Sequence, residues 1–168
     1  MQTNQVPHYD DSVNPTACCP KFNPDGWDGA ELHFENKPFL RAQTRSAMHI
    51  PLNIGKVFAR VDAHMKDAGG WDTSNMIILS RDISPWKSEH FFSTDETVAD
   101  EEMTTLTGDF VTKVFEGPYK DARHWIEEMR KIAAERGKEP KEIFFFYTTC
   151  PKCAKHYGKN YVVGVVQI

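Results

Sequence analysis

The chain has 168 residues, the length of a single domain, and 40% of them are hydrophobic, which is enough to build a buried core. Its net charge is -4, and lysines and arginines are scattered among acidic residues, which disfavours a nucleic-acid partner. No apolar run is long enough to span a membrane, and residues 1–20 are too polar for a signal peptide. We therefore expect a cytoplasmic protein with neither a nucleic-acid nor a membrane partner.

Residues 1–29 are rich in Asn, Pro, Asp and Gly and lack periodic apolar positions. This composition predicts an irregular N-terminal arm. The segment from Cys18 to Trp27 holds two aromatic residues, so we expect it to pack on the rest of the molecule. Residues 30–168 are expected to form one domain built from two similar halves.

The first half begins with a long extended stretch and continues into a helix. Pro51 suits the first turn of that helix, apolar residues then recur at helical spacing, and Gly69 ends it. An acidic, solvated loop from Asp95 to Glu102 closes the half. The elements that we expect are a strand at 31–47, a helix at about 52–68, and strands at 76–79 and 89–92.

The second half repeats this order. Residues 104–116 alternate between apolar and polar side chains, which is typical of a half-buried strand. Gly117 and Pro118 then turn the chain into an amphipathic helix. The further elements that we expect are a helix at about 119–136, a strand at 143–148 that is apolar on both faces, a hairpin connection at 149–159 and a last strand at 161–168.

The order strand, helix, strand, strand therefore occurs twice. Two such units commonly join into one antiparallel sheet with both helices on one face, an α+β arrangement. The sequence thus predicts an open, duplicated β-α-β-β sheet whose other face is free to curve around a ligand.

All four cysteines fall into two tight pairs, Cys18-Cys19 and Cys150-Pro151-Lys152-Cys153. A compact fold that brings the pairs together would place four thiolates around one zinc ion, with His156 as an alternative ligand, and would fasten the arm to the last hairpin. A thiol redox site at Cys150 and Cys153 is disfavoured by its expected place between two strands, because redox CxxC motifs usually begin a helix. Four ordinary thiols are the third alternative.

The segment Lys113-Val114-Phe115-Glu116-Gly117-Pro118-Tyr119 ends a strand with Gly-Pro-Tyr and leads directly into an amphipathic helix. It resembles the GyrI-like domain, also called the bacterial effector-binding domain, whose wider group includes the SOUL haem-binding proteins. The resemblance implies the duplicated fold and covers residues 31–168. No DNA-binding helix-turn-helix precedes the domain, so we expect a stand-alone, cysteine-containing bacterial version.

The resemblance also implies a pocket between the halves for hydrophobic or cationic small molecules. A buried glutamate serves the ligand in several members of that family, and some members resemble hydrolases of strained small molecules. Glu116 lies at a strand end on the Phe110 side and is our candidate for such a glutamate. An exposed residue at a turn is an equally open interpretation.

Aromatic residues are concentrated on the predicted strands, which indicates either a ligand cleft or simply the core beneath the helices. His49, at a strand-to-helix junction, is a further candidate for the cleft. The candidate ligand-binding residues are Trp86, Phe91, Phe110, Phe145, Tyr147 and His49.

Three functions are consistent with these features. The first is a small-molecule-binding domain that holds a hydrophobic or cationic ligand in the cleft. The second is a hydrolase that acts on a reactive small molecule in the same cleft, with Glu116 assisting a water molecule. The third is a thiol redox protein that uses the CPKC motif.

Overall fold

The structure, a computed structural model, describes residues 2–168 apart from the side chain of Thr73; Met1, the first residue of the predicted arm, lies outside the described residues. The strands are β1 (Glu31–Ala47), β2 (Ile50–Pro51), β3 (Ile78–Ser84), β4 (Lys87–Ser93), β5 (Glu102–Glu116), β6 (Glu142–Tyr147) and β7 (Tyr161–Gln167). The α-helices are α1 (Ile54–Asp67), α2 (Ala122–Glu135) and α3 (Pro151–Tyr157), with short 3-10 turns at Thr73–Asn75 and Tyr119–Asp121.

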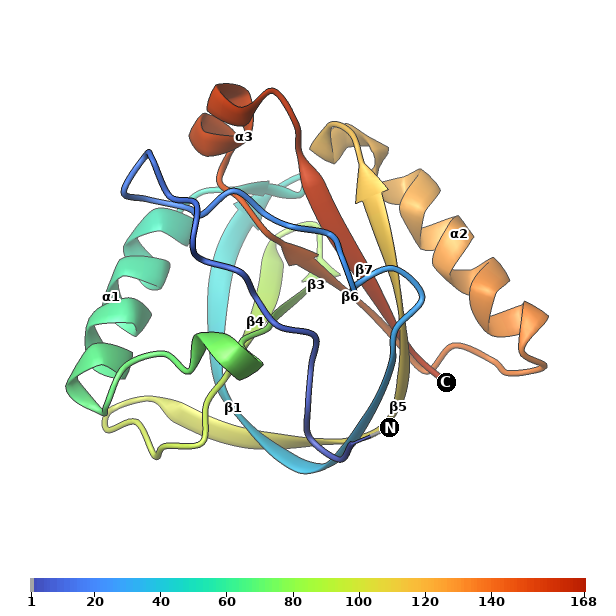
Figure 1. The fold of residues 1–168 in the computed structure, drawn as a ribbon, viewed down its shortest axis with the longest axis horizontal. Helices are drawn as coiled ribbons and strands as arrows, with labels where there is room; N and C mark the ends of the chain where they lie inside the picture. The colour runs from blue at the N-terminus through green and yellow to red at the C-terminus, as the bar shows by residue number, and fades with distance from the viewer. Residues whose placement is uncertain (1) are drawn as a thin grey trace.

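Six strands form a closed antiparallel barrel in the order β1-β4-β3-β6-β7-β5, with β5 pairing back onto β1 (Figure 1). The short β2 extends the edge next to β1. The expected antiparallel pairing and the duplicated element order are present. The expected open sheet with two helices on one face is wrong, because the sheet closes on itself.

The closure follows from the length of β1 and β5. The first part of β1 pairs with β5, from Glu31 opposite Val111 to Arg41 opposite Glu102, and its second part pairs with β4. In the same way the first part of β5 pairs with β1 and its second part pairs with β7. A register shift between Phe34 and Lys37 marks an irregularity of the kind that bends a strand, so one strand can follow the barrel wall around a corner.

The two long helices cover the outside of the barrel, one over each half (Figure 1). The apolar face of α1 packs through Val61 on Leu40 and Phe92 of β1 and β4. The apolar face of α2 packs on β5, β6 and β7, and Met129 lies so close to Gly164 that a Cβ there would come within 2.6 Å of its Sδ. Between the two helices the outer wall formed by β3 and the neighbouring part of β6 is left uncovered by either helix.

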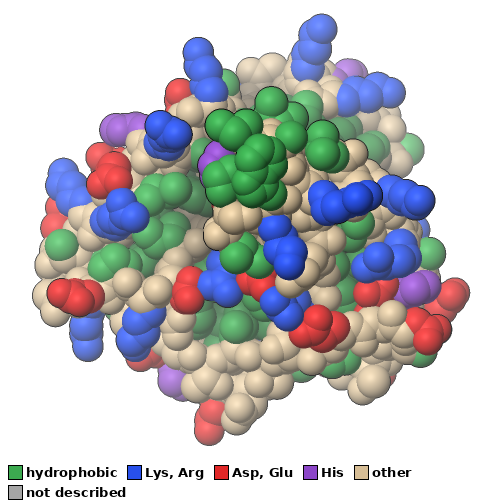
Figure 2. Space-filling view, turned by 180° about the vertical axis from the view of Figure 1, so that it is seen from behind, with side chains coloured by type: hydrophobic (Ala, Val, Ile, Leu, Met, Phe, Trp, Pro, Cys, Tyr) green, Lys and Arg blue, Asp and Glu red, His purple; other side chains and the backbone are tan. Residues whose placement is uncertain are grey.

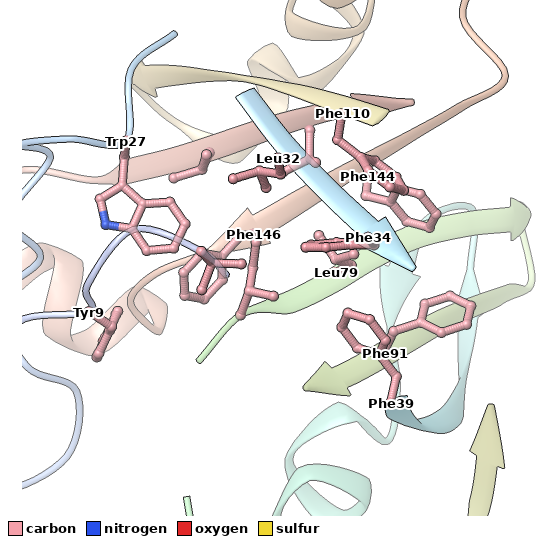
Figure 3. Close-up of a cluster of buried hydrophobic side chains, with 14 of the residues drawn as sticks. Tyr9, Trp27, Leu32, Phe34, Phe39, Leu79, Phe91, Phe110, Phe144 and Phe146 are labelled. Atoms are coloured by element: carbon pink, nitrogen blue, oxygen red, sulfur yellow. The ribbon is translucent and has the colours of Figure 1, made fainter. Parts of the chain in front are cut away.

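Aromatic side chains fill the inside of the barrel (Figure 3). Phe34 and Phe110 pack in a tilted arrangement at 4.9 Å between ring centroids, and Phe91 meets Phe144 edge to face. The N-terminal arm completes this core, because Tyr9, Phe22 and Trp27 are buried against Phe146. The arm is irregular over most of its length, and its aromatic residues belong to the main core.

Two local expectations are corrected by the structure. Pro51 lies in β2, and α1 begins only at Ile54, because the chain first forms a tight hairpin after β1. The CPKC motif does not sit in a plain hairpin loop: Cys150 caps α3 and Pro151 opens it. None of the helices within residues 2–168 has the length and apolar character that crossing a membrane would require.

Candidate active site

A large cleft of about 1700 Å³ lies over the uncovered outer wall of the barrel, between α1 and α2. Ile54 and Phe58 line it from α1, and Ile126 lines it from α2, each on the face that its helix turns toward the other. Phe145 and Tyr147 of β6 form part of its floor. Its size is above the usual range of pockets for small organic ligands, and its walls are mainly apolar.

A buried polar group forms the centre of the floor. His90 of β4 is 4% exposed, and its Nδ1 lies 2.8 Å from Ser80 Oγ on β3 while its Nε2 lies 2.9 Å from Thr44 Oγ1 on β1. Burial lowers the pKa of His90 to about 4, although the charges of Asp82 and Glu89 act in the opposite direction. The ring is therefore neutral at pH 7, donating to one hydroxyl and accepting from the other.

A histidine–aspartate pair lies at one end of the cleft. His49 Nδ1 is 2.6 Å from Asp82 Oδ2, and Asp82 Oδ1 accepts a hydrogen bond of 2.6 Å from Ser88 Oγ. Because an ionised carboxylate only accepts, Nδ1 carries the proton and Nε2 is the basic nitrogen of the neutral ring. No described residue hydrogen-bonds to Nε2, and the side chain of His49 is about half exposed to the cleft.

The backbone that carries His49 is unusual. Ala47 pairs with Ile50, so Met48 and His49 form a two-residue hairpin loop with φ values of 50° and 69°. This left-handed conformation suits a hairpin of this length but costs free energy for residues other than glycine, asparagine and aspartate. Such backbone strain is often found at functional sites, because the surrounding structure holds a side chain in a required direction.

The four cysteines meet at the other end of the cleft. Their Sγ atoms all lie within 4.8 Å of one another, with Cys18 Sγ 3.8 Å from Cys19 Sγ. The Cys150 backbone N–H donates to Cys19 Sγ at 3.4 Å. Of the four, Cys18, Cys19 and Cys150 line the cleft, and Cys153 is buried behind them. We call this group the cysteine cluster; the prediction that the arm and the CPKC motif meet is confirmed, and the cluster could bind a metal ion.

The thiols of the cluster have unequal acidity. Hydrogen bonds from the Thr16 hydroxyl and the Cys19 backbone N–H lower the pKa of Cys153 to about 6. Burial raises the pKa of Cys19, so its proton is held more firmly. The environment thus favours one negative charge within the cluster at neutral pH.

The match to known proteins covers almost the whole chain: residues 9–168 fit the family described as Bacterial hydrolase. The chain belongs to this family. A solved structure, titled as an uncharacterized conserved protein from Listeria innocua, has a similar fold, with a TM-score of 0.56 at 11% sequence identity over 83% of this chain and 91% of that chain. A comparison with curated proteins gives no match. The resemblance to the GyrI-like domain stays a prediction, since none of these matches names that domain.

In this member of the Bacterial hydrolase family, some of the predicted site residues lie at the cleft and others do not. His49, Phe145 and Tyr147 line it. Phe91 and Phe110 instead fill the barrel, because their side chains alternate onto the inner face of their strands (Figure 3).

The other three predicted residues lie on the surface. Trp86 is 59% exposed at the turn between β3 and β4. Glu116 is an exposed residue at the end of β5, with its carboxylate 4.0 Å from Lys159 Nζ, and it does not line the cleft. His156 is exposed on α3 and lies outside the cysteine cluster. The placement of Glu116 removes the basis for its predicted role as a base or as a partner for a cationic ligand.

The polar residues Thr44, Ser80, Asp82 and His90 were not found from the sequence. They are spread over the three neighbouring strands β1, β3 and β4, and short polar residues on strands are common on solvent-facing walls. Ser80 and Asp82 also lie beyond the strand expected at 76–79, whereas β3 continues to Ser84.

Proposed function

We propose that this chain is a hydrolase that adds water to an electrophilic carbon of a mainly hydrophobic small molecule bound between α1 and α2. The observation that carries the proposal is the His49–Asp82 pair at the end of an apolar cleft, with the basic ring nitrogen of His49 left without a partner among the described residues. Membership of the Bacterial hydrolase family supports the reaction class.

In the proposed reaction His49 acts as general base. Its Nε2 removes a proton from a water molecule, and the water oxygen forms a bond to the electrophilic carbon of the substrate as the bond to the leaving atom breaks. The leaving atom then receives the proton from Nε2–H. Asp82 keeps the proton on Nδ1, holds the ring in place and stabilises the positive charge that the imidazole carries between the two transfers.

The floor of the cleft supplies hydrogen-bond donors. Neutral His90 donates to one of its two hydroxyl partners, Ser80 or Thr44, and that hydroxyl keeps its own proton for a substrate oxygen. A donor that is already oriented stabilises negative charge as it develops on the substrate. The apolar walls around Phe58 and Ile126 orient the substrate body.

Chromogenic esters test this proposal, with the p-nitrophenyl esters of acetic, butyric and octanoic acid as probes. We expect ester hydrolysis whose kcat/KM falls by about 10²–10⁴-fold in His49→Gln. The chain offers a matched control, since His33 Nδ1 lies 2.7 Å from Asp109 Oδ1 in an exposed pair away from the cleft. His33→Gln should keep full activity. Equal loss in both variants, or no dependence on His49 across the series, would refute the assignment.

We further propose that the cysteine cluster binds one zinc ion with a structural role. A zinc–sulfur distance of about 2.3 Å in a tetrahedral site requires sulfurs about 3.8 Å apart, and the four Sγ atoms need only small movements to reach that geometry. Four thiolates fill all positions of such a site, which is typical of structural rather than catalytic zinc. The ion would fasten the arm at Cys18 and Cys19 to α3 and so fix one end of the cleft.

Metal analysis of the protein, purified without chelators or metal-affinity resin, tests the zinc proposal. We expect about one zinc per chain and loss of that zinc in Cys150→Ser, with Ser12→Ala as a control in the arm. Metal-free protein with four thiols that react with a thiol reagent would contradict the proposal. Metal-free protein with only two reactive thiols would instead favour the thiol redox alternative. That alternative was disfavoured because the motif was expected in a loop between two strands, whereas Cys150 lies at the start of α3.

A further inference from the structure

Two neighbouring turns at the end of the barrel expose a group of large hydrophobic side chains. Ser46 N–H donates to Trp86 O at 2.8 Å and His49 N–H donates to Pro85 O at 2.9 Å, which holds the β1–β2 turn beside the β3–β4 turn. Of seven strongly exposed large hydrophobic residues in the described chain, five lie on these turns. We call them the tip patch: Met48 67%, Ile50 66%, Leu52 67%, Ile83 49% and Trp86 59% exposed.

Basic side chains surround the tip patch. Arg45 and Lys87 are opposite each other on β1 and β4, directly below the two turns, and Lys56 lies in the first turn of α1 after Leu52. All three are exposed, and none forms an ion pair with another residue of the described chain. Figure 2 shows this face of the molecule, where hydrophobic side chains gather in one group with lysines and arginines close by. The local positive charge stands against a net charge of -4 for the whole chain.

We propose that the tip patch docks on the surface of a membrane that contains anionic lipids. An exposed tryptophan with aliphatic neighbours on protruding turns enters the boundary between headgroups and acyl chains, and adjacent lysines and arginines are attracted to anionic headgroups. Single exposed hydrophobic residues need no explanation, whereas a contiguous group of this kind marks an interaction site.

A second copy of this chain fits the patch less well. A symmetric dimer through the tip patch would place Arg45, Lys56 and Lys87 of one copy near the same residues of the other, which costs electrostatic repulsion. Asp82, the carboxylate next to Ile83, is already held by His49 and Ser88. An anionic surface balances the three basic residues without such repulsion.

This inference differs from the expectation of no membrane partner, which rested on the lack of an apolar run long enough to span a bilayer. Surface docking requires no spanning segment, only a patch that the folded turns assemble from residues 48–52 and 83–86. His49, Pro51 and Ile83 also line the cleft, so a docked molecule would have its cleft entrance near the lipid. The inference itself stands independently of the proposed hydrolase reaction.

Vesicle binding tests the proposal with the full chain. We expect the protein to co-sediment with vesicles of phosphatidylcholine and phosphatidylglycerol, to release as salt is raised, and to bind vesicles of phosphatidylcholine alone much more weakly. Tryptophan emission reports the contact, because Trp27 and Trp125 are buried and Trp71 is half-buried, whereas Trp86 is exposed. Its emission should shift to the blue on binding, and this shift should be absent in Trp86→Phe.

Matched variants distinguish the contribution of the tip patch to vesicle binding from a loss of binding that any surface change would cause. The pair Arg45→Glu with Lys87→Glu should weaken binding about tenfold or more, and Trp86→Ser should weaken it as well. Lys138→Glu and Val13→Ser make similar changes at exposed positions away from the patch and should bind as the parent protein does. Circular dichroism checks that each variant is folded.

Three results would overturn the proposal. The first is parent protein that stays in the supernatant with anionic vesicles. The second is equal loss of binding in the control variants. The third is a concentration-dependent dimer that Trp86→Ser dissociates, which would assign the patch to a second copy. Trp86→Ser measured on dissolved ester, without vesicles, keeps this result separate from the hydrolase proposal, because Trp86 does not line the cleft.

Discussion

Acidification should destabilise this protein through His90, and the structure sets the size of the effect. The side chain is 4% exposed, and burial lowers its pKa from 6.5 to about 4. In the unfolded chain the imidazole takes up a proton as the pH falls below 6.5, whereas the folded protein does so only near pH 4. Protons therefore favour the unfolded state throughout this interval.

The magnitude follows from the difference between the two pKa values. Each unit is worth about 1.4 kcal/mol, so His90 should reduce the free energy of unfolding by about 2 kcal/mol at pH 5 and about 3 kcal/mol at pH 4, relative to pH 7. Above pH 6.5 the imidazole is neutral in both states and contributes no pH dependence. The loss is thus confined to the window between pH 6.5 and 4.

Urea unfolding at a series of pH values from 7 to 4 measures this effect. Carboxylates and the cysteine cluster also titrate, so the useful quantity is the difference in unfolding free energy between the parent protein and His90→Gln. That difference should change by about 3 kcal/mol across the window. Parallel pH profiles for the parent and His90→Gln, or an NMR titration that places the His90 ring near pH 6.5, would refute the reasoning.

Other perturbations test the packing, the barrel end and the arm. Gly164→Ala should lower the free energy of unfolding by about 1–3 kcal/mol, because its Cβ would come within 2.6 Å of a side chain of α2, whereas Gly55→Ala, with open space around it, should be neutral or stabilising in chemical denaturation. Glu89→Gln should cost about 3 kcal/mol, since Glu89 is 2% exposed between two arginines; an unchanged midpoint in urea would contradict this. A zinc chelator should shift tryptophan emission to the red by exposing Trp27, which is fully buried; an unchanged spectrum after zinc loss would show that the arm docks without metal.

Local patterns predicted the elements well. The alternation in residues 104–116 and the helical spacing before Gly69 depend only on neighbours in sequence, and the strands and helices formed there. The closure of the barrel was not predictable in this way, because it depends on the pairing of Glu31 with Val111, far apart in the chain. A long strand has the same sequence pattern whether it pairs with one neighbouring strand along its whole length or with a different strand in each part.

The helix α3 had a signal that was overlooked. Pro151 occupies the first helical position and Gly158 follows the helix in a left-handed conformation, with φ of 70°. This is the usual arrangement of proline at the start and glycine after the end of a helix. The short spacing between two strands favoured a hairpin loop instead, and the helix is brief enough to fit in that space.

The cysteine cluster was predictable and the His49–Asp82 pair was not, for a physical reason. The four cysteines are the only ones in the chain, so their restriction to two segments itself indicated that the segments meet. His49 and Asp82 belong to common residue types, and their meeting depends on the hairpin loop after β1 and on the register of β3 against β4. Tertiary contacts of ordinary residues leave no trace in a single sequence.

The barrel strands hold most residues of one candidate centre directly but not those of the other. Asp82 and the Ser80–His90–Thr44 group sit on three strands that the barrel itself holds in register, and His49 lies in the short hairpin loop that follows β1, so the geometry of both groups depends on the fold alone. The cysteine cluster joins the arm to α3, two segments that lie outside the strands of the barrel. Loss of the proposed metal should therefore alter the end wall of the cleft and the binding of a substrate there, while leaving the proposed base and its orienting carboxylate in place.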